Sequence, residues 1–268
     1  MAQQNNANPM QFADNNAGLK VGERILARNQ NRLYRVRLAQ GSNDVRAAQT
    51  LRFLVFNLEL NEGLEKSFET CRDADPFDDV CDHLLVENAD TGEVVGTYRF
   101  QTGPVAKAQL GYYSAQEFDF APYETVREQT VELGRACVHL NHRNLVVLSL
   151  LWKGIASYAH THNARYLIGC SSLSSQDPSC GASVYSMLIR KHLSEARFQT
   201  VPLPGWICPL DRLHDNPPKI PKLLAAYLSL GARICGPPAL DPIFKTIDFL
   251  TMIDLETLPP ETVQRYLT

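Results

Sequence analysis

Alternation of polar and apolar side chains predicts β-strands in the first half of the chain. Tyr34-Arg35-Val36-Arg37-Leu38 alternates strictly, as expected for a strand with one buried face. Two apolar stretches, residues 83–87 and 94–100, are joined by Ala89-Asp90-Thr91-Gly92, a sequence typical of a hairpin turn. We therefore predict an antiparallel hairpin that follows the first strand.

Apolar residues at helical spacing predict a first helix that Ser42 or Asn43 caps and that runs to about residue 59. Its expected core-facing residues are Ala47, Leu51, Leu54, Val55 and Leu58. Later helices are expected at 144–162, 181–193 and 219–232, and a short one begins at Pro259 and Pro260.

The remaining apolar runs predict strands at 130–139, 165–171 and 246–254, while an acidic loop covers 72–82 and prolines mark an irregular connection at 202–218. An antiparallel meander that turns into a β-α-β unit predicts an α/β (α+β) fold with a mixed sheet between helices. Such a sheet separates where its parallel and antiparallel parts meet, and this leaves free backbone N–H groups beside a cleft.

Composition narrows the class of protein. With 268 residues and a formal net charge of −3, the chain is an ordinary globular one and offers no global reason for nucleic-acid binding. We expect residues 1–30 to be a disordered lead-in and residues 31–268 to form one domain with a C-terminal extension from about 200. The N-terminus has no basic, apolar leader and the longest apolar run is short, so we expect a cytoplasmic protein, with peripheral contact at the inner face of the membrane as an alternative.

The cysteines and the charge distribution add two observations. Seven cysteines with no paired short spacing predict reduced thiols and no zinc or other metal site. Residues 59–132 carry 17 acidic and 5 basic side chains, and residues 133–233 carry 4 acidic and 11 basic ones. The split fits either solvated faces of opposite sign or a site that handles an amine on one side and an acidic partner on the other.

Polar residues also interrupt the predicted elements in four places. These are Arg52 with Phe56, Asp75 with Asp78, Tyr98 with Arg99, and Glu132-Leu133-Gly134-Arg135. A charged pair inside a strand is costly unless it is compensated, so Glu132 forms a structural ion pair with Arg99 or Arg135, or it belongs to a reactive site. Gly134 is a natural position for a β-bulge.

Taken together, these patches resemble the acyl-homoserine-lactone synthases and the long-chain N-acyl amino acid synthases. The resemblance is closer to the bacterial ornithine N-acyltransferases, which form lyso-ornithine lipid, and it covers about residues 35–265. The matching sequence segments include Asp82-His83-Leu84-Leu85-Val86, Glu132-Leu133-Gly134-Arg135-x-Cys137-Val138, Leu151-Trp152-x-Gly154-Ile155-Ala156 and Gly231-Ala232-Arg233-x-Cys235-Gly236. The resemblance implies a GNAT-like three-layer α-β-α fold.

The implied chemistry is transfer of a long, 3-hydroxylated acyl chain from a thioester to the α-amine of an amino acid, with ornithine favoured. Glu132 is then the candidate base, acting directly or through a water, because an ammonium is not a nucleophile. Arg99 and Arg135 bind the substrate carboxylate or orient Glu132, and Asp75 and Asp78 receive its cationic groups or simply form a turn. The backbone near Ala136, Cys137 and Val138 is the candidate oxyanion site, and Arg52 and Phe56 complete the substrate site.

The stretch Arg143-Asn144-Leu145-Val146-Val147-Leu148 lacks the glycines with which coenzyme A-dependent relatives of this fold cradle a pyrophosphate. The resembling families share this loss, which implies acyl-phosphopantetheine on acyl carrier protein as the donor, rather than acyl-coenzyme A, and no permanently bound cofactor. Candidate contacts with the acidic carrier are Arg143, Asn144 and Lys153, with Arg190 and Lys191, or these are ordinary solvated residues.

Other interpretations remain open. One is that the acceptor is another amino acid, and another is that the chain is an acyl-homoserine-lactone-type synthase. A further interpretation is that Cys137 or Cys170 acts as a nucleophile, or that His83, His139 and His142 form a base or metal site. In a different class, the chain is an inactive relative that binds acyl carrier protein or lipid.

Overall fold

The computed structural model describes residues 33–262, so the predicted lead-in 1–30 lies outside the described residues. The strands are β1 (Tyr34–Leu38), β2 (Asp82–Asn88), β3 (Val94–Thr102), β4 (Thr130–Val138), β5 (Tyr166–Leu173), β6 (Arg233–Ile234), β7 (Ala239–Asp241) and β8 (Thr246–Asp254). The α-helices are α2 (Ser42–Phe53), α3 (Ser67–Thr70), α4 (Gly103–Ala108), α5 (Leu145–Thr161), α6 (Pro178–His192) and α7 (Lys222–Ser229). No helix within residues 33–262 is both long enough and apolar enough to cross a membrane.

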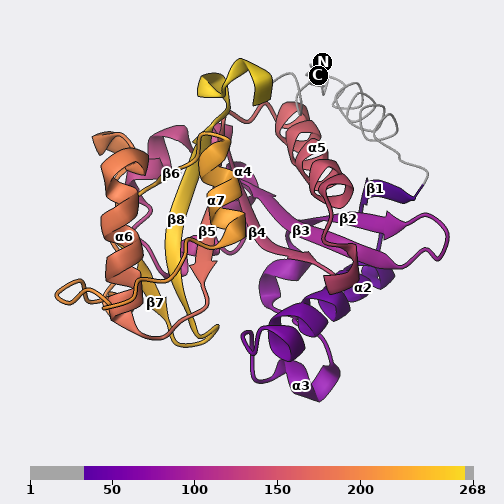
Figure 1. Ribbon diagram of the computed structural model, residues 1–268. Coiled ribbons are helices and arrows are strands. Elements are labelled where there is room, and N and C mark those ends of the chain that lie inside the picture. Colours follow the sequence, from indigo (N-terminus) through magenta and orange to yellow (C-terminus); the bar gives the residue numbers. More distant parts are fainter. Residues whose placement is uncertain (1–32, 263–268) are drawn as a thin grey trace, which may run out of the picture.

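The strands form one sheet in the order β1-β2-β3-β4-β5-β8-β6, with β7 also paired to β8. Every pairing is antiparallel except that of β4 with β5, which is parallel and joins only residues 130–132 to residues 166–168. Beyond these residues the two strands diverge, and Figure 1 shows them separating toward the middle of the molecule. The mixed sheet and its separation point were both predicted from the order of the elements.

Two local features shape the point at which β4 and β5 separate. A Cβ atom at Gly169 would lie 2.1 Å from the Leu133 carbonyl oxygen, so the strands cross here at a distance only glycine permits. On β4, Gly134 lies opposite Arg99 whereas Cys137 lies opposite Thr97, which is the signature of a β-bulge. Arg135 has a φ of +52° within this bulge, an uncommon conformation for a residue with a side chain.

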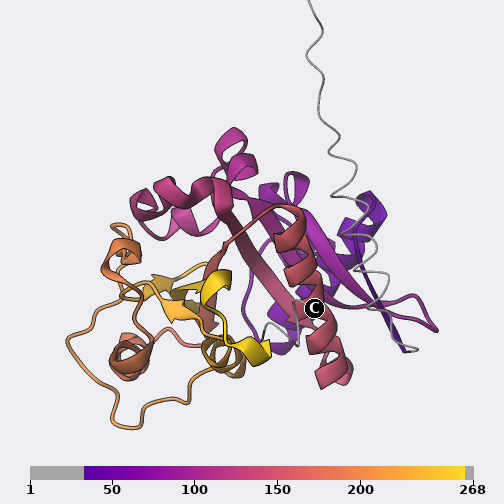
Figure 2. The same ribbon diagram turned by 90° about the horizontal axis from the view of Figure 1, so that it is seen from above.

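Helices cover both faces of the sheet, as Figures 1 and 2 show. We call one side the α5 face, because α5 packs there on Tyr98, Phe100 and Leu167 in the largest apolar cluster, with α6 and α7 beside it. The other side is the α2 face, where α2 packs on Cys137 of β4 and aromatic residues from the 106–126 segment cover β5 and β8. The predicted three-layer fold is therefore confirmed.

The helix boundaries differ from the predictions in instructive ways. Gly41 occupies the cap position of α2, and Asp44 instead accepts a hydrogen bond from the Gln40 N–H. The helix does continue to Glu59, but its last six residues form a π-helix. Leu54 and Leu58 are exposed rather than buried, because the side of the helix that faces the core carries Arg52 and Asn57 instead. α7 is shorter than predicted, and β6 and β7 carry no clear alternating pattern.

Candidate functional site

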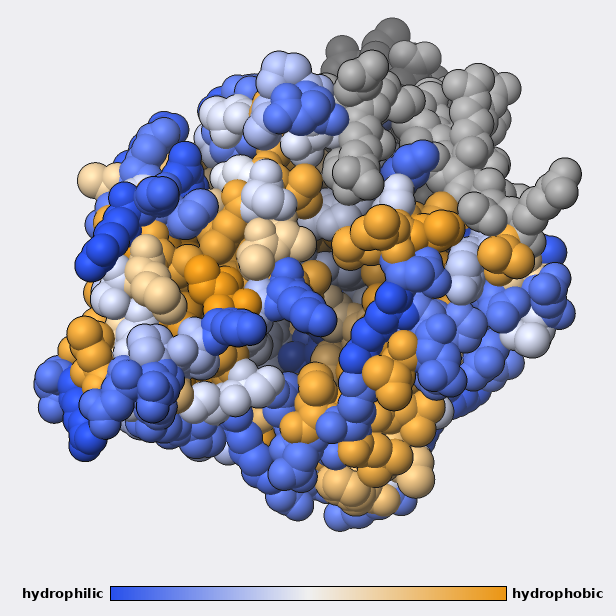
Figure 3. Space-filling view, viewed as in Figure 1, coloured by the Kyte–Doolittle hydropathy of each residue, from blue (hydrophilic) through white to orange (hydrophobic). Residues whose placement is uncertain are grey.

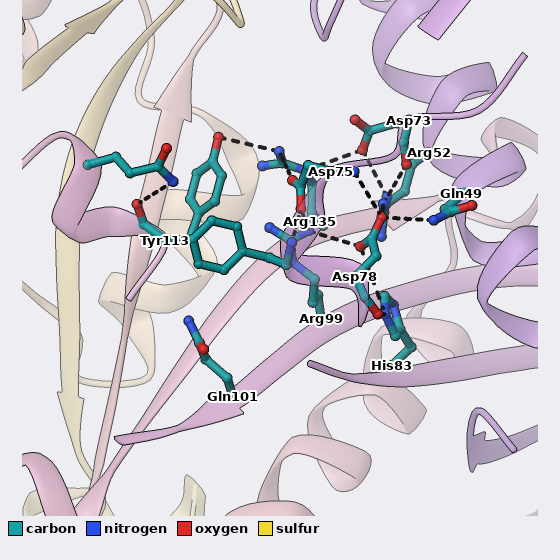
Figure 4. A network of polar contacts seen from close by, with 12 residues as sticks. Gln49, Arg52, Asp73, Asp75, Asp78, His83, Arg99, Gln101, Tyr113 and Arg135 are labelled. Carbon is teal, nitrogen blue, oxygen red and sulfur yellow. Dashed lines mark hydrogen bonds and ion pairs between the residues drawn. The ribbon is translucent and has the colours of Figure 1, made fainter. Parts of the chain in front are cut away.

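Three arginines and three aspartates, most of them buried, form a network between α2, the 73–79 loop, β3 and β4 (Figure 4). Arg52 donates to Asp73 at 2.8 Å and to Asp78 at 2.6 Å. Arg99 donates to Asp75 at 2.6 Å and to Asp78 at 2.9 Å. Because the three positive and three negative charges balance, the network brings segments far apart in sequence together without leaving a net buried charge.

The network fixes the ionisation of its aspartates. Burial opposes ionisation of Asp78, but the Arg52 and Arg99 guanidinium groups outweigh it and hold the pKa of Asp78 well below its usual range. The pKa of Asp75 is lowered in the same way, against its burial, by Arg99 and Arg135. Asp75 also caps the short 3-10 helix Pro76–Asp79 by accepting from the Phe77 N–H, so both aspartates hold a turn as well as an ion pair.

Arg135 projects from the β4 bulge toward the α2 face. It pairs with Asp75 at 2.8 Å and with Asp73 at 3.2 Å. Its guanidinium carbon lies 4.5 Å from the centre of the Tyr113 ring and 4.3 Å from that of Phe244. A guanidinium held between two rings and two carboxylates has a fixed orientation, which explains why the strained backbone at this residue is retained.

Glu132 is buried and makes neither of the ion pairs that the sequence left open. Its Oε1 accepts from the Ser114 N–H at 2.7 Å, and its Oε2 accepts from the Tyr113 N–H at 2.8 Å and from Gln101 Nε2 at 2.6 Å. These three donors hold the carboxylate in one orientation. The same hydrogen bonds anchor the 113–114 turn, which sequence reasoning did not connect with Glu132.

A cavity of about 250 Å³ lies where β4 and β5 separate, and Figure 3 shows the molecule hollowed at its centre on this side. One group of lining residues belongs to the α5 face and is apolar or aromatic: Tyr98, Phe100, Trp152, Leu167, Leu223, Leu224, Tyr227, Ala232 and Ile253. The other group is polar and includes Glu62, Ser114, Glu132, Arg135, Cys170, Ser172, Asp241 and Asp248. The cavity therefore joins an apolar compartment to a polar one through the gap between the strands.

The structure brings together only part of the predicted site. Phe56, Arg99, Glu132, Arg135 and Ala136 line the cavity. Its lining among the described residues does not include Arg52, Asp75, Asp78, Cys137 and Val138. Cys137 and Val138 instead pair with β3, and the other three belong to the ion network behind Arg99 and Arg135.

Of the residues predicted to contact an acyl carrier, Arg143 and Asn144 lie at the start of α5, Lys153 lies in the middle of that helix, and Arg190 and Lys191 lie in the last turn of α6. Asn144 caps α5, and its side-chain oxygen accepts from the N–H groups of Val146 and Val147, both at 3.0 Å. The helix N-terminus is therefore closed by its own side chain instead of being open to a pyrophosphate. Arg143 forms a two-pronged ion pair with Glu59, at 2.5 and 2.7 Å, and Lys153 is half-buried.

The alternative nucleophiles and the histidines are placed as follows. Burial raises the pKa of the Cys137 and Cys170 thiols well above the ordinary value, which opposes formation of the thiolate that a nucleophile needs. His83 Nε2 contacts the Asp78 carbonyl at 3.2 Å, whereas His142 Nδ1 contacts the Tyr34 hydroxyl at 3.0 Å. His139 accepts from the Asn141 N–H, and its ring centre lies 5.5 Å from that of His142.

No role was assigned from the sequence to Glu117, Asp241 and Asp248, which are buried near the polar end of the cavity. Burial and the neighbouring Asp248 and Asp241 carboxylates raise the pKa of Glu117 well above its usual value. Burial likewise raises the pKa of Asp248 to about 6. The signal in the sequence was weak, because each is a single acid within an otherwise apolar strand or loop.

Comparison with known proteins agrees with this geometry. Residues 51–153 match the family model described as an acetyltransferase (GNAT) domain. A solved structure of FeeM, an N-acyl amino acid synthase from uncultured soil microbes, superposes with a TM-score of 0.52 at 12% identity, covering 87% of this chain and 94% of that one. At this identity the likeness shows the fold alone.

Two curated relatives are similar in sequence. The L-ornithine N(alpha)-acyltransferase of Agrobacterium fabrum is 32% identical over 86% of this chain and 84% of that protein. The protein of the same name from Brucella abortus is 30% identical over 93% of this chain and 97% of that protein. The chain belongs to the L-ornithine N(alpha)-acyltransferase family.

Proposed function

We propose that this acyltransferase moves a long-chain 3-hydroxy fatty acyl group from acyl carrier protein to the α-amine of ornithine. The observation that carries the proposal is the cavity at the separation of β4 and β5, which joins an apolar compartment to a polar one. An acyl chain suits the aromatic and aliphatic lining on the α5 face. A charged amino acid suits the polar compartment, and the curated relatives are named for ornithine.

The reaction then takes place in the gap between the strands. The neutral amine attacks the thioester carbonyl carbon, so a C–N bond forms and the C–S bond breaks. Those backbone N–H groups along 133–136 that face the β5 side rather than β3 lie beyond the last β4–β5 pair, and they are available to the oxygen that gains charge in the tetrahedral intermediate. The proton lost by the nitrogen ends on the departing thiolate of the phosphopantetheine arm.

Glu132 is the proposed base and acts through a water. Its Oε1 accepts a single hydrogen bond, from the Ser114 N–H, so a lone pair remains for a water in the cavity that it lines. The three donors that surround the carboxylate hold it in one orientation beside the gap. Arg135, which lines the cavity between Tyr113 and Phe244, is the proposed contact for the carboxylate of the amino acid.

The closed N-terminus of α5 supports acyl carrier protein as the donor. Coenzyme A carries a pyrophosphate that would need the Val146 and Val147 N–H groups, and Asn144 already occupies them. The arm of a carrier protein has one phosphate, and its acidic surface would meet basic residues such as Lys153, Arg190 and Lys191.

The test is a purified reaction with a 3-hydroxyacyl donor and ornithine, analysed by mass spectrometry. We expect Nα-acylornithine from the acyl carrier donor, at least 10-fold less from the coenzyme A donor, and a loss on the order of 100-fold in kcat for Glu132→Gln. In Glu132→Gln the side-chain amide would face the Tyr113 N–H and Gln101 donors, and this mismatch could itself destabilise the fold. A thermal unfolding curve shows whether the variant is folded, and Glu132→Asp keeps a carboxylate, so the two controls separate misfolding from loss of the base. A folded Glu132→Gln variant with full activity would contradict the assignment of the base.

The other outcomes decide between the alternatives. Acylation of a different amino acid would keep the reaction class and replace the acceptor. Binding of acyl carrier protein without turnover on any amine would favour the inactive binding module.

A further inference from the structure

Three buried acids lie together on the α2 face, beside the proposed reaction site. We call Glu117, Asp241 and Asp248, with the thiol of Cys170, the acidic subsite. The side chains of Glu117, Asp241 and Asp248 are 1%, 2% and 5% exposed. One ligand atom each from Glu117, Cys170 and Asp248 lie within 4.8 Å of one another, and Cys170, Asp241 and Asp248 line the cavity.

The sheet places the acidic subsite on the same side as Glu132. Glu132 is paired with Ile168 across β4 and β5, and Cys170 and Ser172 follow at two-residue steps, so all point to one face. Asp248 lies directly opposite Ser172 on the neighbouring strand β8. The 114–117 segment crosses the same face, with the Ser114 N–H on Glu132 and the Glu117 carboxylate 3.8 Å from the Cys170 sulfur.

The acidic subsite lacks the compensation found in the ion network. Asp248 Oδ1 is buried and accepts no hydrogen bond of ordinary geometry from any residue in the 33–262 range. Asp241 accepts from the N–H groups of Ile243 and Phe244, which hold the loop rather than supply a full charge. Asp248 and Glu117 do interact with each other, but no lysine or arginine in the described residues forms an ion pair with these three acids. A buried carboxylate oxygen without a partner is costly, so this pocket is set up for a cationic group of a ligand.

We propose that the acidic subsite binds the distal ammonium of a dibasic amino acid, while the α-amine of that amino acid lies at Glu132. The proposal rests on the proposed function and names the residues that select its acceptor. The three methylene groups of ornithine would span the floor of the cavity between Glu132 and Asp248, over Ser114 and Cys170. Asp75 and Asp78, the acids that the sequence suggested for this task, already face two guanidinium groups each.

The experiment compares ornithine with norvaline, which has the same chain length and no distal amine. With one acyl donor, we expect the wild-type kcat/KM to favour ornithine. In Asp248→Asn and Glu117→Gln we expect this preference to fall on the order of 10- to 100-fold, mainly through KM for ornithine, with norvaline turnover kept. The matched control is Asp254→Asn on the same strand, an acid that pairs with Arg165 outside the cavity, and we expect it to leave the preference unchanged.

Direct binding gives a second readout that does not depend on turnover. Calorimetry with ornithine alone should show weaker binding to Asp248→Asn than to the wild type, and the thermal midpoint confirms that each variant is folded. An unchanged ratio of ornithine to norvaline in folded Asp248→Asn would overturn the acidic subsite and leave the proposed function intact. Transfer to neither amino acid by the wild type would overturn both.

The same acids and thiol have a geometry that a divalent metal could use, so the assay includes a chelator. Activity that is lost with EDTA and restored by zinc would overturn the ammonium assignment in favour of a metal. Full activity in EDTA is the result we expect.

Discussion

Arg52 has no exposed side-chain surface, and its charge is compensated by Asp73 and Asp78. Arg52→Met would leave parts of two buried carboxylates without a cation. We expect it to lower the free energy of unfolding by about 3–5 kcal/mol, measured by urea denaturation. Arg143→Met, which removes an ion pair with the partly exposed Glu59, should cost less than about 1 kcal/mol. Equal losses in the two variants would contradict the structural role of the network.

Asp248 should make stability depend on pH in the direction opposite to Asp78. Its pKa of about 6 in the folded state, against 3.8 for the ordinary group, means that the folded protein holds a proton that the unfolded chain has released. Stability therefore falls as pH rises through roughly 4 to 6, and the penalty is complete above that window.

Removing the carboxylate should remove this penalty. We expect Asp248→Asn to stabilise the protein at pH 8 on the order of 2 kcal/mol, and by much less at pH 4. Urea denaturation at the two pH values measures the difference. The same gain at both values would mean that the charge of Asp248 is not the cause.

At the scale of residues, the sequence pointed to charged side chains but not to their partners. Arg52, Arg99 and Arg135 could be singled out because charged residues are rare within apolar helices and strands, and Asp75 and Asp78 because their spacing matches that of the resembling families. Their pairing depends on loops that cross the sheet, and no spacing along the chain encodes that geometry. For the same reason the Glu132 contact with the Ser114 N–H could not be predicted.

At the scale of elements, β4 and β5 show why a parallel pair can remain short. The carbonyl of Leu133 occupies the space that a side chain at position 169 would need. Beyond this crossing the bulge at Arg135 turns β4 away, so the pairing ends after three residues. The sequence predicted the divergence from the topology and a bulge near Gly134, but the left-handed conformation falls on the next residue because the ion pairs and rings hold Arg135 in place.

The crossing can be tested with two glycines. Gly169→Ala would push its methyl group into the Leu133 carbonyl oxygen, and we expect a loss on the order of 2 kcal/mol in stability together with reduced turnover. At Gly134 nothing lies within 4 Å of the added Cβ, so Gly134→Ala should leave stability nearly unchanged. Chemical denaturation of both variants measures the contrast, and equal effects would show that the close crossing is not what constrains Gly169.

The helices show what apolar periodicity can and cannot predict. It predicted α5 and α6 within a few residues, because both bury a wide apolar stripe against the sheet. It mis-assigned Leu54 and Leu58, because α2 buries the charge of Arg52 and the π-helix that continues it buries the amide of Asn57. A buried polar contact overrides the hydrophobic pattern wherever its partner comes from a distant segment.

At the scale of the whole molecule, residues after position 200 are needed to complete the cavity. Leu223 and Tyr227 come from α7, and Asp248 and Ile253 from β8, and they line the cavity together with residues of β3 to β5. The C-terminal part of the chain is thus built into the central sheet and into both compartments.

The apolar compartment should set the length of the acyl chain. Leu223→Trp places a larger ring where α7 borders this compartment, and we expect the product profile to shift toward shorter chains by about two to four carbons, since each buried methylene contributes about 0.8 kcal/mol. Leu210→Trp is the matched control, because Leu210 is 39% exposed like Leu223 and does not line the cavity. Mass spectrometry of the N-acyl products measures the profile. An unchanged profile in Leu223→Trp would place the acyl chain elsewhere.

The separation of β4 and β5 also bears on how a finished product leaves. If the two reactants come from opposite faces, the new amide bond forms inside the sheet. The product then extends through the gap, with its acyl chain on the α5 face and its charged amino acid on the α2 face. Neither end can retreat by its original route without drawing the other through the gap. The product must then pass through the gap in every cycle, and the width of the gap, which Glu132 does not influence, would limit how fast it leaves.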